Sequence, residues 1–350
     1  MSDENDIINE EQNDLYEHYS FNVDKGQSPI RIDKYVTDKI EGASRNRIQN
    51  AADADWILVN GTPKKSNYKV KPLDKISIVM PYERRGVEII PENIPLDILY
   101  EDDDLLVVNK AAGMVVHPGH GNYSGTLVNA LAYYLRENEN MNLDDERAGL
   151  LVHRIDKNTS GTIVVAKKLD VLKNLAQQFF NHTVQRRYFA LVWGRFENSE
   201  GTVTGNIARS TSDRLRFKVY DDENIGKHAV THYKVVEDLG YVSLIECKLE
   251  TGRTHQIRVH LSHIGHPLFN DGRYGGDKIL YGTTFTKYKQ FINNCFDIVP
   301  HHVLHAAVLG FVHPTTKKEM LFEVPMPDNM QALIDKWRKY ISNREIEEEF

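Results

Sequence analysis

The chain has few cysteines and no long apolar segment. Only Cys247 and Cys295 are present among 350 residues, too few for a disulfide framework or a Cys-x-x-Cys metal site, so we expect a reducing cytoplasm. The longest apolar runs, such as residues 306–312, are too short to span a bilayer. The acidic, polar N-terminus resembles neither a secretory signal nor a transit peptide. We therefore expect neither a disulfide-rich scaffold nor a membrane-spanning protein.

Several common catalytic motifs are also absent. The sequence contains no G-x-x-x-x-G-K-[ST] phosphate loop and no G-x-S-x-G elbow, and its glycine-rich "GHGNYSG" does not fit G-x-G-x-x-G after a strand. Six of the 15 histidines lie in "HLSHIGH" and "HHVLH", but neither cluster contains H-E-x-x-H or a neighbouring cysteine pair. We therefore predict structural or RNA-facing histidines and no metal site.

Acidic residues are concentrated at the two ends of the chain. Residues 1–27 hold eight acidic residues against one lysine, and "NREIEEEF" at the C-terminus is also acidic. These ends account for the net charge of −7, and residues 28–342 between them carry a net charge of +3. We predict an acidic, disordered tail over residues 1–27 and a second acidic tail over residues 341–350.

Residues 28–80 form a basic module with ten Lys and Arg against six Asp and Glu. "RIDKYVTDKI" has a helical apolar stripe, and Ser44 could cap a second helix, "RNRIQNAAD". "WILVNGTPKK" indicates a strand, an Asn-Gly turn and a basic loop, and "YKVKPLDKISIVM" indicates two short strands. Four cations could bind RNA phosphates or could simply form a solvated surface: Arg45, Arg47, Lys64 and Lys65.

This module resembles the S4-type RNA-binding domain through "RIDKYV", "SRNRIQ", "VNG" and "KVKPLDKI". Two positions depart from that family's pattern, because Asp55 and Leu73 stand where glycine is usual. The resemblance implies a small α/β domain that binds RNA.

Residues 81–95 mix proline, glycine and charge, so we predict a linker there. Residues 96–340 contain many short β-rich runs and few helical patterns, and we predict an α+β domain with a large, mixed but mainly antiparallel sheet. The helices are expected within "TLVNALAYYLRE", "LDVLKNLAQQFFNH", "TKYKQFINN" and "NMQALIDKWRKYIS".

Three segments place polar residues among apolar ones. In "GLLVHRIDKNTSGTIVVAKK" we predict two strands joined by a loop that carries Asp156, either as an Asx turn or as a reactive group. "VQRRYFALVWG" predicts a strand that carries Tyr188. In "GRTHQIRVHLSHIGH" the apolar residues alternate with cations, which predicts a strand whose Arg253 and Arg258 could hold a carboxylate or phosphate.

Together these motifs resemble the RNA pseudouridine synthases, specifically the ribosomal-large-subunit type with an S4-type domain in front. "HRIDKNTSG" is similar to that family's H-R-L-D-x-x-T-S-G, with Ile155 in place of leucine. "RRYFALVWG", "GRTHQIRVHLSHIGHPLFND", "NKAAGMVVHPGHGNYSGTLVNAL" and "LHAAVLGFVHPTT" resemble further family motifs. The likeness covers about residues 30–330 and implies the pseudouridine synthase fold.

The resemblance implies a role for several residues. Asp156 would be the catalytic aspartate, Tyr188 would stack on the target base, and Arg258 would pair with Asp156. Arg154 would enter the RNA stack when the uridine flips out. The remaining RNA contacts are assigned to His153 and Arg253, besides the four cations of the S4-like module.

The chemistry implied is cleavage of the bond between C1′ and N1 of uridine, ring rotation, reattachment through C5 and loss of the C5 proton. Asp156 could attack C1′ or remove the 2′ proton, and the sequence does not choose between them. No cofactor or metal is implied. The expected partner is RNA, either 23S-type ribosomal RNA or a pre-ribosomal particle, with no membrane, and the expected state is a monomer. A transfer-RNA modifier, a non-catalytic RNA-binding assembly factor and a nucleoside glycosidase are the alternatives.

Overall fold

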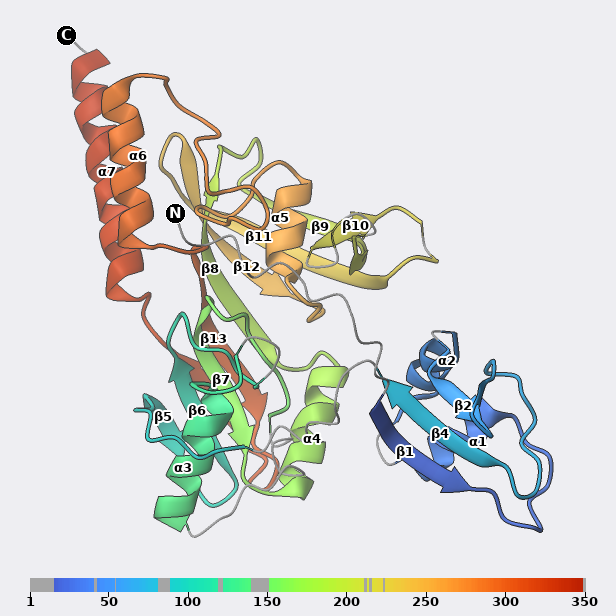
Figure 1. Ribbon diagram of the computed structural model, residues 1–350. Coiled ribbons are helices and arrows are strands. Elements are labelled where there is room, and N and C mark those ends of the chain that lie inside the picture. The colour runs from blue at the N-terminus through green and yellow to red at the C-terminus, as the bar shows by residue number, and fades with distance from the viewer. Residues whose placement is uncertain are drawn as a thin grey trace, which may run out of the picture. The chain divides into compact units, whose positions relative to one another are not determined.

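The computed structural model describes residues 16–40, 43–53, 55–80, 89–118, 122–139, 151–210, 213, 216–222 and 224–348. The chain divides into two compact units, residues 1–86 and 87–350, whose elements are labelled in Figure 1. None of the helices in the described ranges combines the length and the apolar character needed to cross a membrane.

The first unit is an antiparallel sheet with the strand order β1-β4-β2-β3, packed against two helices. The apolar stripe predicted in "RIDKYVTDKI" is buried, with Ile32 and Val36 fully enclosed, and the Asn60–Gly61 turn joins β2 to β3 as predicted. The elements are α1 (Ile32–Lys39), α2 (Arg45–Asp53), β1 (Tyr16–Asn22), β2 (Ile57–Val59), β3 (Thr62–Pro63) and β4 (Lys75–Met80).

Two predictions for this unit were wrong. "YKVKPLDKISIVM" forms one strand, β4, and contributes only an isolated bridge from Lys69 to Arg31. The predicted disordered tail contains β1, which pairs with β4, and the β1 residues Tyr19 and Phe21 pack against the core of this unit. Asp55 and Leu73, the two departures from the S4 pattern, have positive φ angles of 60° and 70°, the conformation that glycine adopts most readily.

The second unit contains a ten-stranded sheet with the order β10-β9-β11-β12-β8-β13-β7-β6-β5, in which β14 pairs with β13. Every pairing is antiparallel except that of β13 with β7, which confirms the predicted mixed, mainly antiparallel sheet. The strands are β5 (Ile98–Glu101), β6 (Leu105–Lys110), β7 (Ser160–Ala166), β8 (Gln185–Trp193), β9 (Glu200–Arg209), β10 (Phe217–Tyr220), β11 (Lys227–Asp238), β12 (Val242–Leu249), β13 (Leu304–Val312) and β14 (Glu319–Glu323).

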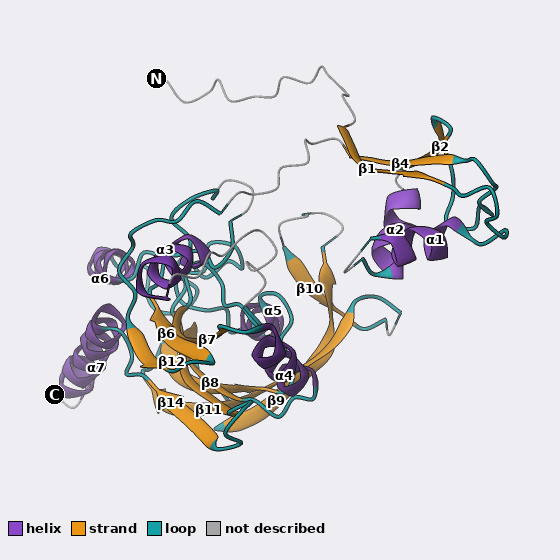
Figure 2. Ribbon diagram, turned by 90° about the horizontal axis from the view of Figure 1, so that it is seen from below, coloured by secondary structure: helices purple, strands orange, loops and turns teal. Residues whose placement is uncertain are grey.

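Helices cover this sheet at several places. α4 contacts β7 and β13, whereas α5 contacts β9, β10 and β11. Figures 1 and 2 show the sheet as one curved layer, with α6 and α7 side by side at one end of the unit. Strand β7 is buried along its whole length, so it gives the loop before it a rigid anchor. The helices are α3 (Leu127–Glu139), α4 (Leu169–Phe180), α5 (Gln256–His263), α6 (Thr286–Ile298) and α7 (Asp328–Glu348).

Several boundaries in the second unit differ from the predictions. Of the expected strand "GLLVHRID", the described residues 151–156 form a loop with a single bridge from Leu151 to Val165. The predicted C-terminal tail is largely helical, because α7 extends to Glu348. Within the predicted linker, residues 81–88 lie outside the described part, and Ile89 packs against α3.

The segment "QIRVHLSH" forms helix α5 and not the predicted strand. The alternation of apolar and polar residues suggested one buried face, but residues 256–261 are all buried. A short helix enclosed on all sides shows no 3.6-residue polarity pattern, so periodicity could not distinguish it from a strand.

Candidate active site

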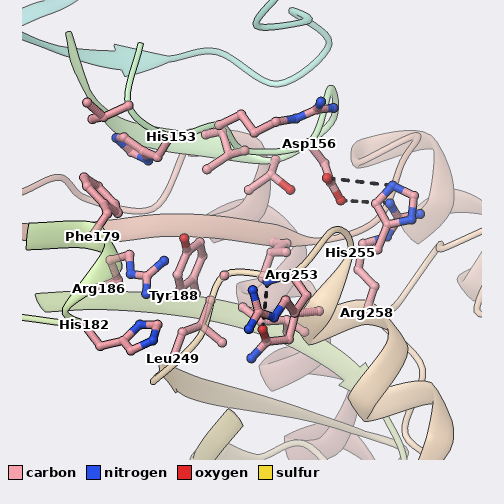
Figure 3. A pocket seen from close by; sticks show the side chains of 18 of the residues that line it. His153, Asp156, Phe179, His182, Arg186, Tyr188, Leu249, Arg253, His255 and Arg258 are labelled. Carbon is pink, nitrogen blue, oxygen red and sulfur yellow. Dashed lines mark hydrogen bonds and ion pairs between the residues drawn. The ribbon is translucent and has the colours of Figure 1, made fainter. Parts of the chain in front are cut away.

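The predicted catalytic residues meet in one pocket of about 520 Å³ in the second unit. The loop before β7 contributes Arg154 and Asp156, strand β8 contributes Tyr188, and the segment around α5 contributes Arg253 and Arg258. Figure 3 shows Asp156, Tyr188 and Arg253 around the pocket, with Arg258 and His255 on the side of Asp156. Residues more than 100 positions apart in the sequence thus form one site.

Asp156 lies on a loop that is held from both sides. The Thr159 backbone N–H donates to the Asp156 backbone carbonyl at 3.1 Å, which makes a backbone turn. The hydroxyl of Thr159 bonds Nε2 of buried His302 at 3.1 Å, which ties the loop to the segment before β13. The loop therefore turns at Asp156 through backbone atoms and does not form the predicted Asx turn, because the Asp156 carboxylate bonds Arg258.

Arg258 joins two aspartates. Its Nη1 donates to Oδ2 of Asp156 at 2.9 Å. Its Nε and Nη2 donate to the two carboxylate oxygens of Asp271 at 2.7 and 2.9 Å, a bidentate contact. Asp271 is fully buried, and the Arg258 guanidinium carbon lies 4.9 Å from the ring centre of Tyr274. Asp271 thus fixes the orientation in which Arg258 meets Asp156.

His255 approaches the other oxygen of Asp156. Its Nε2 lies 3.8 Å from Asp156 Oδ1. The Tyr274 hydroxyl accepts the Phe217 N–H at 3.2 Å and lies 2.8 Å from Nδ1 of His255. The hydroxyl proton is therefore free to be donated to Nδ1, which leaves the imidazole proton on Nε2, facing Asp156.

The electrostatics keep Asp156 ionised. Burial alone would raise the pKa of Asp156, but the neighbouring His255 and Arg258 outweigh it, so that pKa lies below its usual value. Burial lowers the pKa of His255 to about 4, against an opposing effect of Asp156. His255 is therefore neutral near pH 7, and Arg258 supplies the positive charge that stabilises the carboxylate.

Lys110 supports the same loop from below. It is 2% exposed, and its Nζ donates to the carbonyls of Ala111, Met114 and Lys157 at 2.7, 2.9 and 3.1 Å. Burial lowers the pKa of Lys110 to about 7, against an opposing effect of Asp156. Three carbonyl acceptors match the three N–H groups of an ammonium, so Lys110 fixes the backbone directly after Asp156.

Tyr188 contributes an aromatic face to the pocket while it remains part of the core. It is 8% exposed and packs with Ala190 and Cys247. Burial raises the pKa of Tyr188, so the phenol is neutral at physiological pH. Its location next to Asp156 agrees with the predicted stacking role, which the geometry permits.

The other predicted RNA contacts differ in their surroundings. Arg154 is exposed at the pocket, and Arg253 donates from Nε to the His228 carbonyl at 3.0 Å. His153 also lines the pocket, but its Nε2 accepts the Val164 N–H at 3.0 Å, and its ring stacks on Phe179 at 4.6 Å. The contacts of His153 are therefore internal, in contrast to the expected RNA contact.

The S4-like cations lie in the first unit and not in this pocket. Arg45 bonds the buried carboxylate of Asp33 at 3.1 Å, and Lys65 bonds Asp55 at 2.9 Å. Lys64 Nζ lies 5.8 Å from the ring centre of Tyr68. The side chain of Arg47 lies outside the described residues.

The histidine clusters have internal contacts, which agrees with the prediction of structural histidines. His260 is fully buried, with its Nδ1 2.9 Å from the Thr231 hydroxyl, and His305 lies 2.8 Å from the Ser160 hydroxyl. Among the described residues one group could share an ion: Asp102, Asp104 and His313. These side chains already bond one another or Lys168, and they lie outside the pocket lining.

Sequence reasoning missed the residues that position Arg258 and the loop. Asp271, within "PLFNDGRYGG", and Lys110, within "NKAAG", both lie in segments that had been compared with the family. Asp271 and Lys110 stand beside turn residues or at the end of a strand, where a charged residue is usually exposed on the surface. Only burial reveals their function.

The chain is similar to known proteins of one family. Residues 104–263 match the family model described as RNA pseudouridylate synthase. An RNA pseudouridine synthase of Chlorobaculum parvum is 44% identical over 91% of this chain and 97% of its own length. The ribosomal large subunit pseudouridine synthase D of Zymomonas mobilis is 41% identical over 90% of this chain and 95% of its own length.

The solved structure of human RNA pseudouridylate synthase domain containing 4 has the same fold. It aligns with a TM-score of 0.53 and 23% identity, over 69% of this chain and 93% of the human chain.

Proposed function

The chain belongs to the RNA pseudouridine synthase family, and on this premise we propose that it converts specific uridines of large-subunit ribosomal RNA to pseudouridine. One observation carries the proposal: an ionised carboxylate, Asp156, lies beside a buried aromatic residue, Tyr188, in a pocket of about 520 Å³. A uridine inside a helix cannot reach such a carboxylate, so it must first be extruded, at a cost of a few kcal/mol.

Arg154 is suited to fill the space that the extruded base leaves. It is exposed at the pocket, only two residues from Asp156, and it has a long, planar cationic side chain. Tyr188 can then offer its ring to the uracil, since stacking on an aromatic side chain contributes about 1–3 kcal/mol per base. The loop thus places the stack-filling residue and the reactive residue at opposite ends of one short segment.

The reaction breaks the bond between C1′ and N1 and forms one between C1′ and C5. We infer that Oδ1 of Asp156 is the reactive oxygen, because Oδ2 is held by Arg258. Oδ1 either bonds C1′, as in a retaining glycosidase, or accepts the 2′ proton. After the ring rotates and rejoins, C5 loses its proton and N1 gains one, so no atoms are lost and no cofactor is consumed.

The neutral His255 can assist the reaction as a hydrogen-bond donor. Its Nε2–H faces Asp156 Oδ1 and is available to a ribose hydroxyl or a uracil oxygen in the pocket. A donor of this kind stabilises charge that develops on the leaving base. Cys247 and Cys295 are both free and buried, as we expect for a protein of the reducing cytoplasm.

The test is tritium release from RNA labelled at uracil C5. Unmodified transcripts of large-subunit ribosomal RNA and of transfer RNA are compared as substrates, with Asp156→Asn as the inactive variant. We expect release from ribosomal RNA that Asp156→Asn abolishes while its melting curve stays that of the wild type. Release from transfer RNA alone would contradict the substrate, free uracil would indicate a glycosidase, and full activity of Asp156→Asn would refute the role of Asp156.

A further inference from the structure

A second arginine, Arg186, lies in the pocket without a carboxylate partner among the described residues. It is 8% exposed, and its Nε is enclosed and makes no hydrogen bond. Among the residues that the structure describes, no carboxylate forms an ion pair with Arg186. A buried cation without a counterion is costly, so such a residue in a binding pocket is a candidate ligand site.

The surrounding chain is built to hold this side chain in place. Arg186 lies two residues before Tyr188 on β8, so both side chains point from the same face of the strand. A Cβ atom on Gly252 would lie 2.9 Å from Nη1 of Arg186, so the missing side chain leaves room for the guanidinium. The guanidinium carbon also lies 5.6 Å from the ring centre of Phe179. Figure 3 shows Arg186 beside Tyr188 and Phe179.

The charges of the pocket favour an anion at this place. Four arginines but only one carboxylate, Asp156, line the pocket, and Asp156 is already bonded to Arg258. His153, which also lines it, has a pKa lowered to about 3 by burial and by Arg186, so it is neutral. The positive charge of Arg186 thus stays uncompensated in the free protein.

We propose that Arg186 binds a backbone phosphate of the RNA next to the extruded uridine. This inference rests on the proposed function, since it uses the nucleotide that Asp156 and Tyr188 would hold. Phosphate is the anion that RNA supplies, and a ribose at Asp156 carries its 3′ and 5′ phosphates on the same sugar. An arginine presents several N–H groups in a fixed plane, which suits the oxygens of a phosphate.

Arg186 could instead donate to a uracil oxygen, and salt dependence separates the two modes. A phosphate contact releases counterions, so its loss lowers the slope of log affinity against log salt by about 0.7–0.9. A hydrogen bond to a base edge leaves that slope unchanged. The substitution that tests this is Arg186→Met, which keeps a long side chain and removes its positive charge.

Arg187→Met is a matched control, because it removes the same charge from the next residue of β8. Arg187 points away from the pocket, where it pairs with Glu246 at 3.3 Å. The probe is an unmodified transcript of large-subunit ribosomal RNA, bound at several salt concentrations, with tritium release and thermal melting measured on the same proteins.

We expect Arg186→Met to bind this RNA about tenfold more weakly with a reduced salt slope, and to melt no lower than the wild type because an uncompensated charge has been removed. Its KM should rise more than its kcat falls, whereas Arg187→Met should keep the wild-type slope. An unchanged slope in Arg186→Met, or an equal change in Arg187→Met, would overturn the phosphate subsite. Binding does not need turnover, so a wild type without tritium release would refute only the proposed function.

Discussion

Arg258 and Arg186 line the same pocket and are both more than nine-tenths buried, yet within the described part of the chain only Arg258 has carboxylate partners. Asp156 and Asp271 take up the hydrogen bonds of Arg258, so this end of the pocket is complete in the free protein. The Arg186 end has a cation with an unsatisfied Nε. The difference indicates that the Arg258 end of the pocket positions the reactive carboxylate and that the Arg186 end binds a charged ligand.

The largest effect should come from Arg258→Met. This change leaves Asp156 and Asp271 as buried carboxylates without their partner, which typically costs about 3–5 kcal/mol of stability. We also expect tritium release to be lost, because burial would raise the pKa of Asp156. Urea unfolding measures the stability, and Arg186→Met serves as the comparison. Equal destabilisation by the two substitutions would contradict the contrast between the two ends.

A somewhat smaller effect is expected from Asp271→Asn, which acts on Asp156 through Arg258. The amide cannot reproduce the bidentate contact, so Arg258 shifts, and we expect kcat to fall about 100-fold. The acid limb of the pH profile should move to higher pH, because a displaced Arg258 stabilises the Asp156 carboxylate less and burial then raises the pKa of Asp156. An acid limb that stays in place would show that Asp271 does not act by orienting Arg258.

A third prediction concerns acid stability. Burial lowers the pKa of His255 to about 4 and of His153 to about 3, whereas the unfolded chain titrates near 6.5. The unfolded state therefore binds more protons below pH 6.5, and stability falls as the pH drops from 6.5 toward 4, by about 1.4 kcal/mol per pH unit for each proton. Urea unfolding at several pH values measures this loss.

His153 also reports on the Arg186 end, because the charge of Arg186 helps to lower its pKa. Arg186→Met should raise the pKa of His153 toward 6.5, so the loss of stability from this group is smaller in total and is complete at a higher pH. His153→Gln provides the control, since its amide oxygen can accept the Val164 N–H and does not titrate. If Arg186→Met left the total acid loss of stability unchanged in the chain that retains His153, the effect of the Arg186 charge on His153 would be refuted.

The mixed sheet and most helices could be predicted from the sequence, because "RIDKYV" has a regular helical stripe and β7 and β8 contain apolar runs. Sequence reasoning missed α5 because a helix buried on all sides has no polar face, and it missed β1 because charge dominated that segment. Asp156, Tyr188 and Arg258 were found through ordered motifs. Their partner Asp271 and the unpaired Arg186 could not be found, because pairing across 13 or more residues and burial are properties of the folded chain.

The first unit also contains cations with and without carboxylate partners, and their substitution should have the smallest effect on RNA affinity. Arg45 shares the buried Asp33 with Arg31 and Gln49, and these hydrogen bonds hold the pKa of Asp33 far below its usual value against the opposing effect of burial. An arginine already bonded in this way has less to offer a phosphate, so we expect Arg45→Met to change the affinity for ribosomal RNA by about twofold or less.

Lys64 is the control for Arg45, because it has no carboxylate partner among the described residues. Its Nζ lies near the Tyr68 ring, whereas its neighbour Lys65 pairs with Asp55. If S4-like binding uses free cations, Lys64→Met should weaken RNA binding more than Arg45→Met, and both should weaken it less than Arg186→Met. The three variants are compared in one salt titration with the same transcript. A larger loss in Arg45→Met than in Lys64→Met would mean that ion pairing in the free protein does not determine which cations meet the RNA, and the same objection would then apply to Arg186.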